Sequence, residues 1–86
     1  MAELARFDGI IIRMYPEAGG RHHRAHLHAY YGEHEAVYTI SPIKLIEGKF
    51  PNSQHDKVVA WATKHQAELL AAWKNLRAGR TVGKIQ

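Results

Sequence analysis

Two alternating segments on either side of Gly32-Glu33 constrain the fold of this chain more than any other feature. Residues 25–31 and 34–41 alternate apolar and polar side chains with the period of a β-strand. A two-residue turn with glycine first is typical of a type II′ hairpin. The resulting register places Leu27, Ala29, Ala36 and Tyr38 on one face, and His26, His28, Tyr30, Glu35, Val37 and Thr39 on the other. One face is therefore apolar and the other mostly polar, so we expect both histidines to point away from the core.

A third strand is predicted over residues 7–15, FDGIIIRMY, because the segment is rich in β-branched and aromatic residues. The apolar positions 10, 12 and 14 recur with period two and fit the core face. If this strand pairs beside the hairpin, Arg13 and Tyr15 share the polar face with the two histidines. Residues 43–50 alternate weakly and are compatible with a short edge strand or with a turn at Glu47-Gly48.

A helix is predicted from Gln54 to Ala78, with Gly79 as its end. Residues at spacings of three and four form its apolar stripe, which comprises Val58, Ala62, His65, Leu69, Ala72 and Leu76. We expect His65 to be a core histidine bonded to a backbone group or a strand residue. A straight helix of this length would span about 37 Å, so either its last turns project from the body or it breaks.

These elements predict an α+β fold, in which a three- to four-stranded antiparallel sheet packs on one long C-terminal helix. We expect a single domain at residues 1–79, followed by a flexible basic tail at residues 80–86. A chain of 86 residues has a small core. A second copy of the chain is therefore one candidate partner.

The composition restricts the cellular setting and the chemistry. The chain has 45% hydrophobic and 23% charged residues, as ordinary globular proteins do. No apolar run approaches the ~20 residues that cross a bilayer, and the N-terminus lacks an apolar signal region. There is no cysteine, which excludes disulfides, thiolate zinc sites and cysteine nucleophiles. We expect a cytoplasmic protein that does not bind membranes.

The formal net charge is +4, and basic residues gather in two places. Arg21 and Arg24 lie before the hairpin, and Arg77 and Arg80 lie near the C-terminus. Together with Tyr30 and Tyr31, these residues are candidates for contact with nucleic acid or with a protein partner. The alternative is solvated charge that keeps a small protein soluble.

The pair His26 and His28 could present two imidazoles to one metal ion, with Glu35 as the nearest carboxylate. The spacing from Gly20 through both histidines to Glu33 also matches the first metal motif of cupins. A cupin needs a longer, double-sheet barrel and a second motif, so that interpretation is rejected. We expect no native cofactor, with adventitious zinc or nickel at the histidines as the alternative.

The same face carries the types of side chain that metal-independent RNA cleavage requires. His26 and His28 would act as base and acid, Arg13 would stabilise the charged phosphorane, and Tyr15 or Glu35 would orient them. The competing interpretation is a partner-binding surface, for which Tyr, Arg and His are equally suitable. The residues alone leave open whether the protein is an enzyme.

Several short motifs spread over the chain resemble one bacterial family, the domain of unknown function 4160. Its members carry R-F-x-G-I-x-I-x-M-Y, P-P-H-F-H-x-x-Y-G, a glutamate, L-E-G-x-L-P and W-A-x-x-H-Q-x-E-L-x-x-x-W. The counterparts here are Arg6-Phe7, Gly9-Ile10 through Met14-Tyr15, His26-Leu27-His28, Tyr31-Gly32, Glu35, Ile46-Glu47-Gly48 with Pro51, Trp61-Ala62, His65-Gln66, Glu68-Leu69 and Trp73. The chain departs from the family at Arg24-Ala25, where two prolines are usual.

The resemblance implies a small cytoplasmic protein without an established activity. Genes of this family commonly sit beside those of another small family, an arrangement similar to toxin–antitoxin pairs. This implies a small protein partner encoded nearby. We therefore expect one component of a two-protein, toxin–antitoxin-like module, whose polar sheet face binds the partner, with RNA as a second candidate ligand. The alternatives are a metal-independent endoribonuclease toxin and a small metal-binding or regulatory adaptor.

Overall fold

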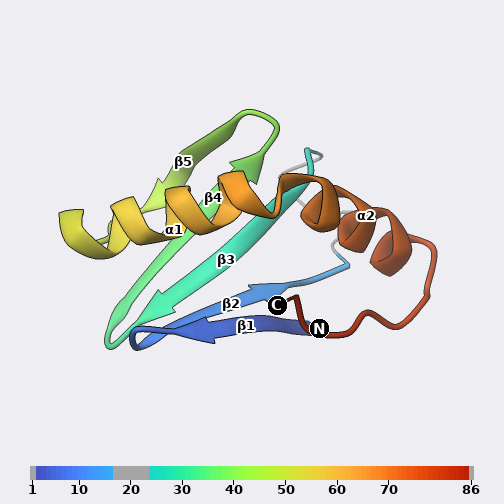
Figure 1. Cartoon of the computed structure of the whole chain (residues 1–86), viewed down its shortest axis with the longest axis horizontal. Coiled ribbons are helices and arrows are strands. Elements are labelled where there is room, and N and C mark those ends of the chain that lie inside the picture. Colours follow the sequence, from blue (N-terminus) through green and yellow to red (C-terminus); the bar gives the residue numbers. More distant parts are fainter. Residues whose placement is uncertain (1, 17–23, 86) are drawn as a thin grey trace.

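The structure, a computed structural model, describes residues 2–16 and 24–85. Five strands form one antiparallel sheet in which each strand pairs with the next one along the chain (Figure 1). The elements are β1 (Ala2–Phe7), β2 (Ile10–Met14), β3 (His26–Tyr31), β4 (His34–Ile40), β5 (Ile43–Gly48), α1 (Asn52–Lys64) and α2 (Gln66–Arg77). The α+β class agrees with the sequence. The sheet has five strands where three or four were expected, and two helices replace the single long one.

The central hairpin, β3–β4, has the register that the alternation predicts. Leu27 lies opposite Tyr38, and Tyr30 lies opposite Glu35. Gly32 has a φ of 57°, and Asp8 is the only non-glycine among the described residues with a positive φ. The signs at Gly32-Glu33 are therefore those of a type II′ turn, in which only the first central residue is left-handed.

The N-terminal strand β1 was missed in the sequence. Residues 7–15 do not form one strand, because the chain reverses at Asp8-Gly9, where φ is 51° and 78°. Two successive left-handed residues are the mark of a type I′ turn, and Asp-Gly is one of its preferred pairs. Phe7 consequently pairs with Ile10 across the turn. The Asp-Gly pair was the signal that could have revealed this hairpin.

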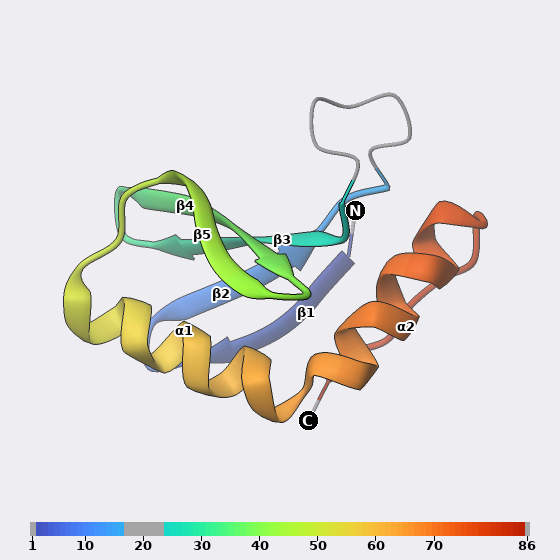
Figure 2. The same ribbon diagram turned by 90° about the horizontal axis from the view of Figure 1, so that it is seen from above.

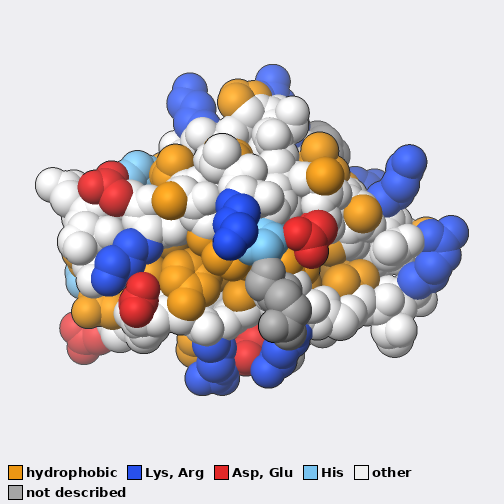
Figure 3. All heavy atoms as spheres, in the orientation of Figure 1, with side chains coloured by type: hydrophobic (Ala, Val, Ile, Leu, Met, Phe, Trp, Pro, Cys, Tyr) orange, Lys and Arg blue, Asp and Glu red, His pale blue; other side chains and the backbone are white. Residues whose placement is uncertain are grey.

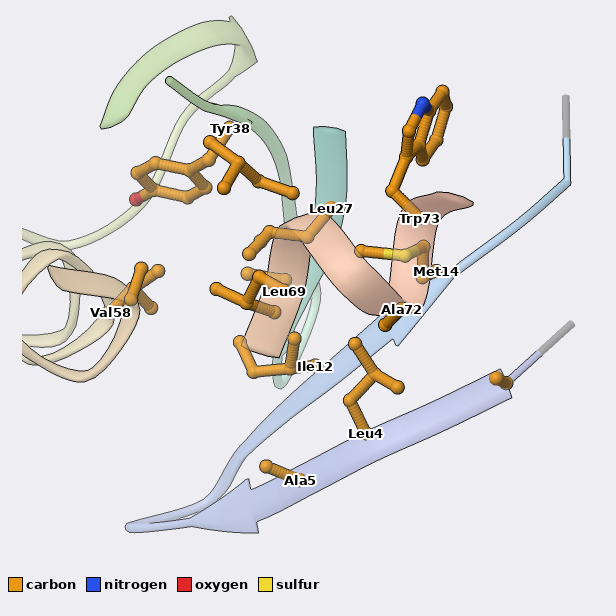
Figure 4. Packing of buried hydrophobic residues seen from close by; sticks show 14 of the residues in the cluster. Leu4, Ala5, Ile12, Met14, Leu27, Tyr38, Val58, Leu69, Ala72 and Trp73 are labelled. Atoms are coloured by element: carbon orange, nitrogen blue, oxygen red, sulfur yellow. The ribbon is translucent and has the colours of Figure 1, made fainter. Parts of the chain in front are cut away.

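Both helices cover the same face of the sheet, and we call the other face the open face (Figure 2). The core lies between the sheet and the helices, with Leu27, Tyr38, Leu69 and Trp73 among its labelled members (Figure 4). Every position of the predicted helix stripe is buried: Val58, Ala62, His65, Leu69, Ala72 and Leu76. The stripe was therefore predicted correctly, although it runs along two helices.

The helical segment breaks at His65, where φ is −111° and ψ is 21°. The molecule is 34 Å long on its longest axis, slightly less than a straight helix of the predicted length would need. The Gln66 side-chain amide donates to the Ile40 carbonyl, 2.7 Å away, and ties the break to the end of β4. His65 Nδ1 donates to the Glu68 carboxylate at 2.7 Å. Its partner is thus a carboxylate on the next turn, and the expectation of a backbone or strand partner was wrong.

The two edges of the sheet differ in which segments of the chain lie along them. Of the two expectations for residues 43–50, the edge strand is the one observed, as β5. At the other edge, residues 80–85 return to β1, where the Ile85 amide donates to the Leu4 carbonyl at 2.8 Å (Figure 1). Val82 and Ile85 pack against the core. The segment expected to be a flexible tail therefore lies against the sheet as far as residue 85.

The helices are short and amphipathic. Among the described residues, no helix is long and apolar enough to cross a membrane.

Candidate functional site

Five side chains gather in the middle of the open face, and we call them the open-face cluster: Arg13, Tyr15, His28, Tyr30 and Glu35. Pairing of β2 with β3 sets Arg13 opposite His28. Pairing of β3 with β4 sets Tyr30 opposite Glu35. The sequence predicted that these residues share a face, provided that β2 lies beside the hairpin, and the strand order satisfies this condition.

The aromatic members of the cluster contact one another closely. The hydroxyls of Tyr15 and Tyr30 form a hydrogen bond of 2.8 Å. The His28 ring stands edge-on to the Tyr15 ring at 4.7 Å between centres. It also stacks near-parallel to the Tyr30 ring at 6.4 Å. Each ring is held from two directions, so the cluster is ordered before any ligand arrives.

Charges of both signs surround these rings. The Arg13 guanidinium lies 5.4 Å from the centre of the Tyr30 ring, within the range of a cation–π contact. On its other side, Arg13 lies 3.9 Å from Glu3 of β1. His28 Nδ1 lies 3.6 Å from the Glu35 carboxylate. The cluster therefore carries a cation on β2, at Arg13, and an anion on β4, at Glu35, while Glu3 of β1 lies beside Arg13.

Glu3 is a member of this surface that the sequence did not reveal. A regular register would set Leu4 opposite Arg13, but a bulge between Glu3 and Ala5 sets Glu3 there instead. The pKa of Glu3 is lowered, first by the hydrogen bond from Arg6 and then by the charges of Arg6, Lys84 and Arg13. Glu3 is accordingly an anion that is held by Arg6 and lies within ion-pair distance of Arg13. The alternation of side chains along β1 was the available sequence signal for the residues on this face. The bulge shifts that alternation by one residue.

The pKa of Tyr30 is raised well above that of an exposed tyrosine. Burial of the hydroxyl is the largest cause, followed by its hydrogen bond with Tyr15 and by the charge of Glu35. Arg13 acts in the opposite direction and does not compensate. Tyr30 therefore keeps its proton at neutral pH, and it serves as a hydrogen-bond donor or acceptor and not as a base.

His26 does not join the cluster at the surface, which corrects the expectation that both histidines belong to one site on the polar face. Its register on the open face is as predicted, opposite Thr39, but its side chain is fully buried. Because a carbonyl can only accept, Nδ1 donates to the backbone oxygen of Arg24 at 2.8 Å. The ring also lies 4.7 Å from that of Trp73 in α2. The turn at His65 carries α2 past the end of the sheet (Figure 2). Trp73 of α2 therefore covers the start of β3 at His26.

A groove of about 310 Å³ adjoins the cluster on its β4–β5 side. It is lined by His28, Glu35, Ala36, Val37, Glu47 and Gly48. Val37 belongs to the open face yet is only 5% exposed, so the floor of the groove is apolar. Glu47 was not predicted as a site residue, because the conformation of residues 42–51 could not be read from the sequence.

The other predicted binding residues lie elsewhere. Tyr31 faces the helices, with its ring 6.3 Å from that of Phe50. Arg77 lies over the Trp73 ring at 5.7 Å, and Arg80 donates to the Asn75 side chain. Arg24 is exposed beside His26, while Arg21, like His22 and His23, lies outside the described residues. The contacts of Tyr31, Arg77 and Arg80 are thus made with residues outside the open-face cluster.

The charge distribution does not single out the helix-bearing side as a nucleic-acid surface. On that side lysine and arginine are interspersed with acidic side chains and apolar patches (Figure 3). Within residues 2–16 and 24–85, no group of three or more histidine, aspartate or glutamate side chains is arranged to hold a metal ion. A metal at His26 and His28 would also have to reach an imidazole that is sealed beneath Trp73.

No curated protein and no solved structure matches the chain. The model of one protein family, described as a domain of unknown function (DUF4160), matches residues 9–74. This match begins at the β1–β2 turn and extends into α2, so it includes the hairpin, the break at His65 and Trp73. Because it takes in most of the chain, the protein belongs to the DUF4160 family, as the motifs in its sequence indicate.

Proposed function

We propose that the open-face cluster is the docking surface for a protein partner, and that this chain is one component of a two-protein, toxin–antitoxin-like module. One observation carries the proposal. Ordered aromatic and charged side chains occupy the middle of the sheet face that neither helix covers, and their contacts with each other already fix their positions. The partner expected from the family resemblance is a small protein encoded nearby.

The chemistry of the cluster suits a protein interface. Tyrosine and arginine are enriched among the residues that contribute most to binding energy. Rings that are already held lose little conformational entropy when a partner arrives. Arg13 on one side and Glu35 on the other give the surface a direction, because a partner with complementary charges fits in one orientation only.

A two-histidine ribonuclease is less well supported. In such a mechanism both imidazoles must reach the ribose and the leaving oxygen. His28 borders the groove, but His26 is fully buried, and its Nδ1 proton is donated to the Arg24 carbonyl. Arg13, Tyr30 and His28 could still contact RNA without cleaving it. Protein binding does not require an accessible second imidazole, so it fits the arrangement of these side chains better than catalysis does.

The proposal is tested by co-expressing the chain with the product of the adjacent gene and measuring the affinity of the purified pair by calorimetry. We expect Arg13→Ala and Tyr30→Ala each to weaken binding at least about tenfold. Lys64→Ala, at the exposed end of α1, is the matched control and should leave the affinity unchanged. Equal affinities for all four proteins would contradict the proposal. Cleavage of added RNA by the isolated chain, abolished in His28→Ala, would contradict it in favour of an enzyme.

A further inference from the structure

Basic side chains outnumber acidic ones where β1 borders the open face. Three of them surround the single carboxylate of Glu3, and we call them the basic patch: Arg6, Arg13 and Lys84. Arg6 donates one hydrogen bond to each oxygen of Glu3, at 2.7 and 3.0 Å. Lys84 Nζ and Arg13 Nη2 lie 3.7 and 3.9 Å from the same carboxylate. Within residues 2–16 and 24–85, no other carboxylate is in ion-pair distance of the three, so positive charge exceeds negative charge here.

The excess charge of the basic patch is accessible to a ligand. The side chains of Lys84, Arg6 and Arg13 are 64%, 60% and 31% exposed, whereas that of Glu3 is 21% exposed. Arg6 occupies both oxygens of Glu3, and the contacts of the other two cations with Glu3 are too long for hydrogen bonds. In the described part of the chain, Arg13 Nε has no hydrogen-bond acceptor. Arg13 and Lys84 can therefore donate to a further anion without breaking a hydrogen bond.

Segments from both ends of the chain build the basic patch. Arg6 and Tyr30 both lie opposite Ile11, one on each side, so Arg6 is in the same row of the open face as a member of the cluster. Lys84 comes from the C-terminal segment that returns to β1 (Figure 1). Arg13 is a member of both groups. The basic patch is therefore continuous with the open-face cluster, on the side away from β4.

We propose that the basic patch binds acidic side chains, aspartate or glutamate, of the protein that docks on the open face. This inference rests on the proposed function and adds the chemistry of the partner. A carboxylate accepts charge-assisted hydrogen bonds from guanidinium and ammonium groups, and a guanidinium can hold it with two parallel bonds. The C-terminal segment, through Lys84, is then part of the docking surface.

The acidic residues of the open face favour a protein over a nucleic acid as the ligand. Glu3 lies in the middle of the basic patch, and Glu35, whose side chain is 56% exposed, lies on the other side of the cluster. A nucleic acid carries a phosphate charge at every nucleotide, so a strand that crosses the open face meets both carboxylates. A protein can present isolated acidic residues to the patch and basic ones to Glu35.

Calorimetry with the co-expressed partner measures what the patch contributes. We expect Lys84→Glu and Arg6→Glu each to weaken binding about tenfold, because each sets a like charge against the acidic side chains of the partner. Added salt should weaken the parent complex more than either variant complex. Lys64→Glu, the same charge reversal on α1, is the matched control and should have no effect, and circular dichroism shows whether each variant is folded. If Tyr30→Ala weakens binding and both patch variants bind like the parent, this inference is overturned and the proposed function stands.

A second arm does not need the partner. Tetraglutamate is titrated into the isotope-labelled chain, and the side-chain Nε–H signals of Arg6 and Arg13 are followed by nuclear magnetic resonance. We expect these signals to shift with tetraglutamate, to shift less in Lys84→Glu, and to stay in place with tetralysine. Signals that tetraglutamate leaves unchanged would overturn the inference even if the partner binds. Tighter binding of an oligouridylate of equal charge would overturn it in favour of a nucleic acid.

Discussion

Two histidines on the same strand, two residues apart and on the same face, lie in different environments. At the start of β3, His26 is sealed beneath Trp73 and bonded to a backbone carbonyl. In the middle of the open face, the His28 side chain keeps 14% of its surface exposed and contacts Tyr15, Tyr30 and Glu35. The first region contributes to the fold, and the second lies in the open-face cluster that we propose as the docking surface.

The difference arises from an element far away in the sequence. Strand periodicity determines the face on which a side chain lies, and it does so correctly for both histidines. Exposure depends in addition on what covers that face. Here the break at His65 redirects α2 so that Trp73 reaches around the end of the sheet. A shared face is therefore insufficient evidence for a shared role.

The largest expected effect comes from removing the cover. Trp73 is only 9% exposed, and truncating a buried tryptophan costs roughly 3–5 kcal/mol. We expect Trp73→Ala to lose about 3 kcal/mol of unfolding free energy, measured by urea denaturation. Tyr30→Ala in the open-face cluster should lose only about 1 kcal/mol. Equal losses would show that the two regions do not divide into fold and surface as described.

The histidines themselves give a smaller but sharper contrast. His26→Ala removes a buried ring and leaves the Arg24 carbonyl without its donor, which should cost about 2 kcal/mol. His28→Ala should cost less than about 1 kcal/mol. The order should reverse when partner affinity is measured, with His28→Ala weakening binding more than His26→Ala does. If His26→Ala is the milder change in denaturation, His26 is not the structural member of the pair.

The smallest effect concerns the pair of tyrosines. Burial and the bond to Tyr15 raise the pKa of Tyr30, so its phenolate should form later than that of an exposed tyrosine as pH rises. Tyr15→Phe should lower the pKa of Tyr30 in an ultraviolet titration. Tyr38, whose pKa burial alone raises to about 12, serves as the internal reference and should not move.

The same titration has a consequence for stability. A tyrosine with a raised pKa in the folded protein binds its proton more tightly there than in the unfolded chain. Its contribution to stability is full below the unfolded value of about 10, and it declines as pH rises from there through the folded value. Tyr15→Phe should therefore make unfolding less sensitive to pH in this alkaline range. An unchanged sensitivity would mean that the hydroxyl pair does not hold the proton on Tyr30.

Local patterns predicted the centre of this molecule well. The turn at Gly32, the β3–β4 register and the buried helix stripe all follow from periods of two and of three to four residues. The outward direction of Arg13 also followed, because the apolar face of β2 points inward, but its place opposite His28 depended on a strand order that the sequence left open. These features depend on residues close together in the sequence, where a period is visible.

The remaining features depend on packing between distant segments. The bulge that brings Glu3 to Arg13 has no local signature, and neither does the return of residues 80–85 to β1. The sequence left a break in the helix as one of two alternatives. The predicted helix was long for so small a body, but its length did not indicate at which residue it would break. The β1 hairpin is different, because Asp8-Gly9 was a readable signal that the apolar run after it obscured.

The central claim is that a partner docks on the open face at the cluster, and the most direct measurement is nuclear magnetic resonance of the isotope-labelled chain during titration with that partner. We predict that the amide signals of Arg13, Tyr15, His28, Tyr30 and Glu35 shift first and furthest. Signals of the exposed sides of α1 and α2 should stay in place. Shifts confined to the helices, with the cluster unchanged, would contradict the account.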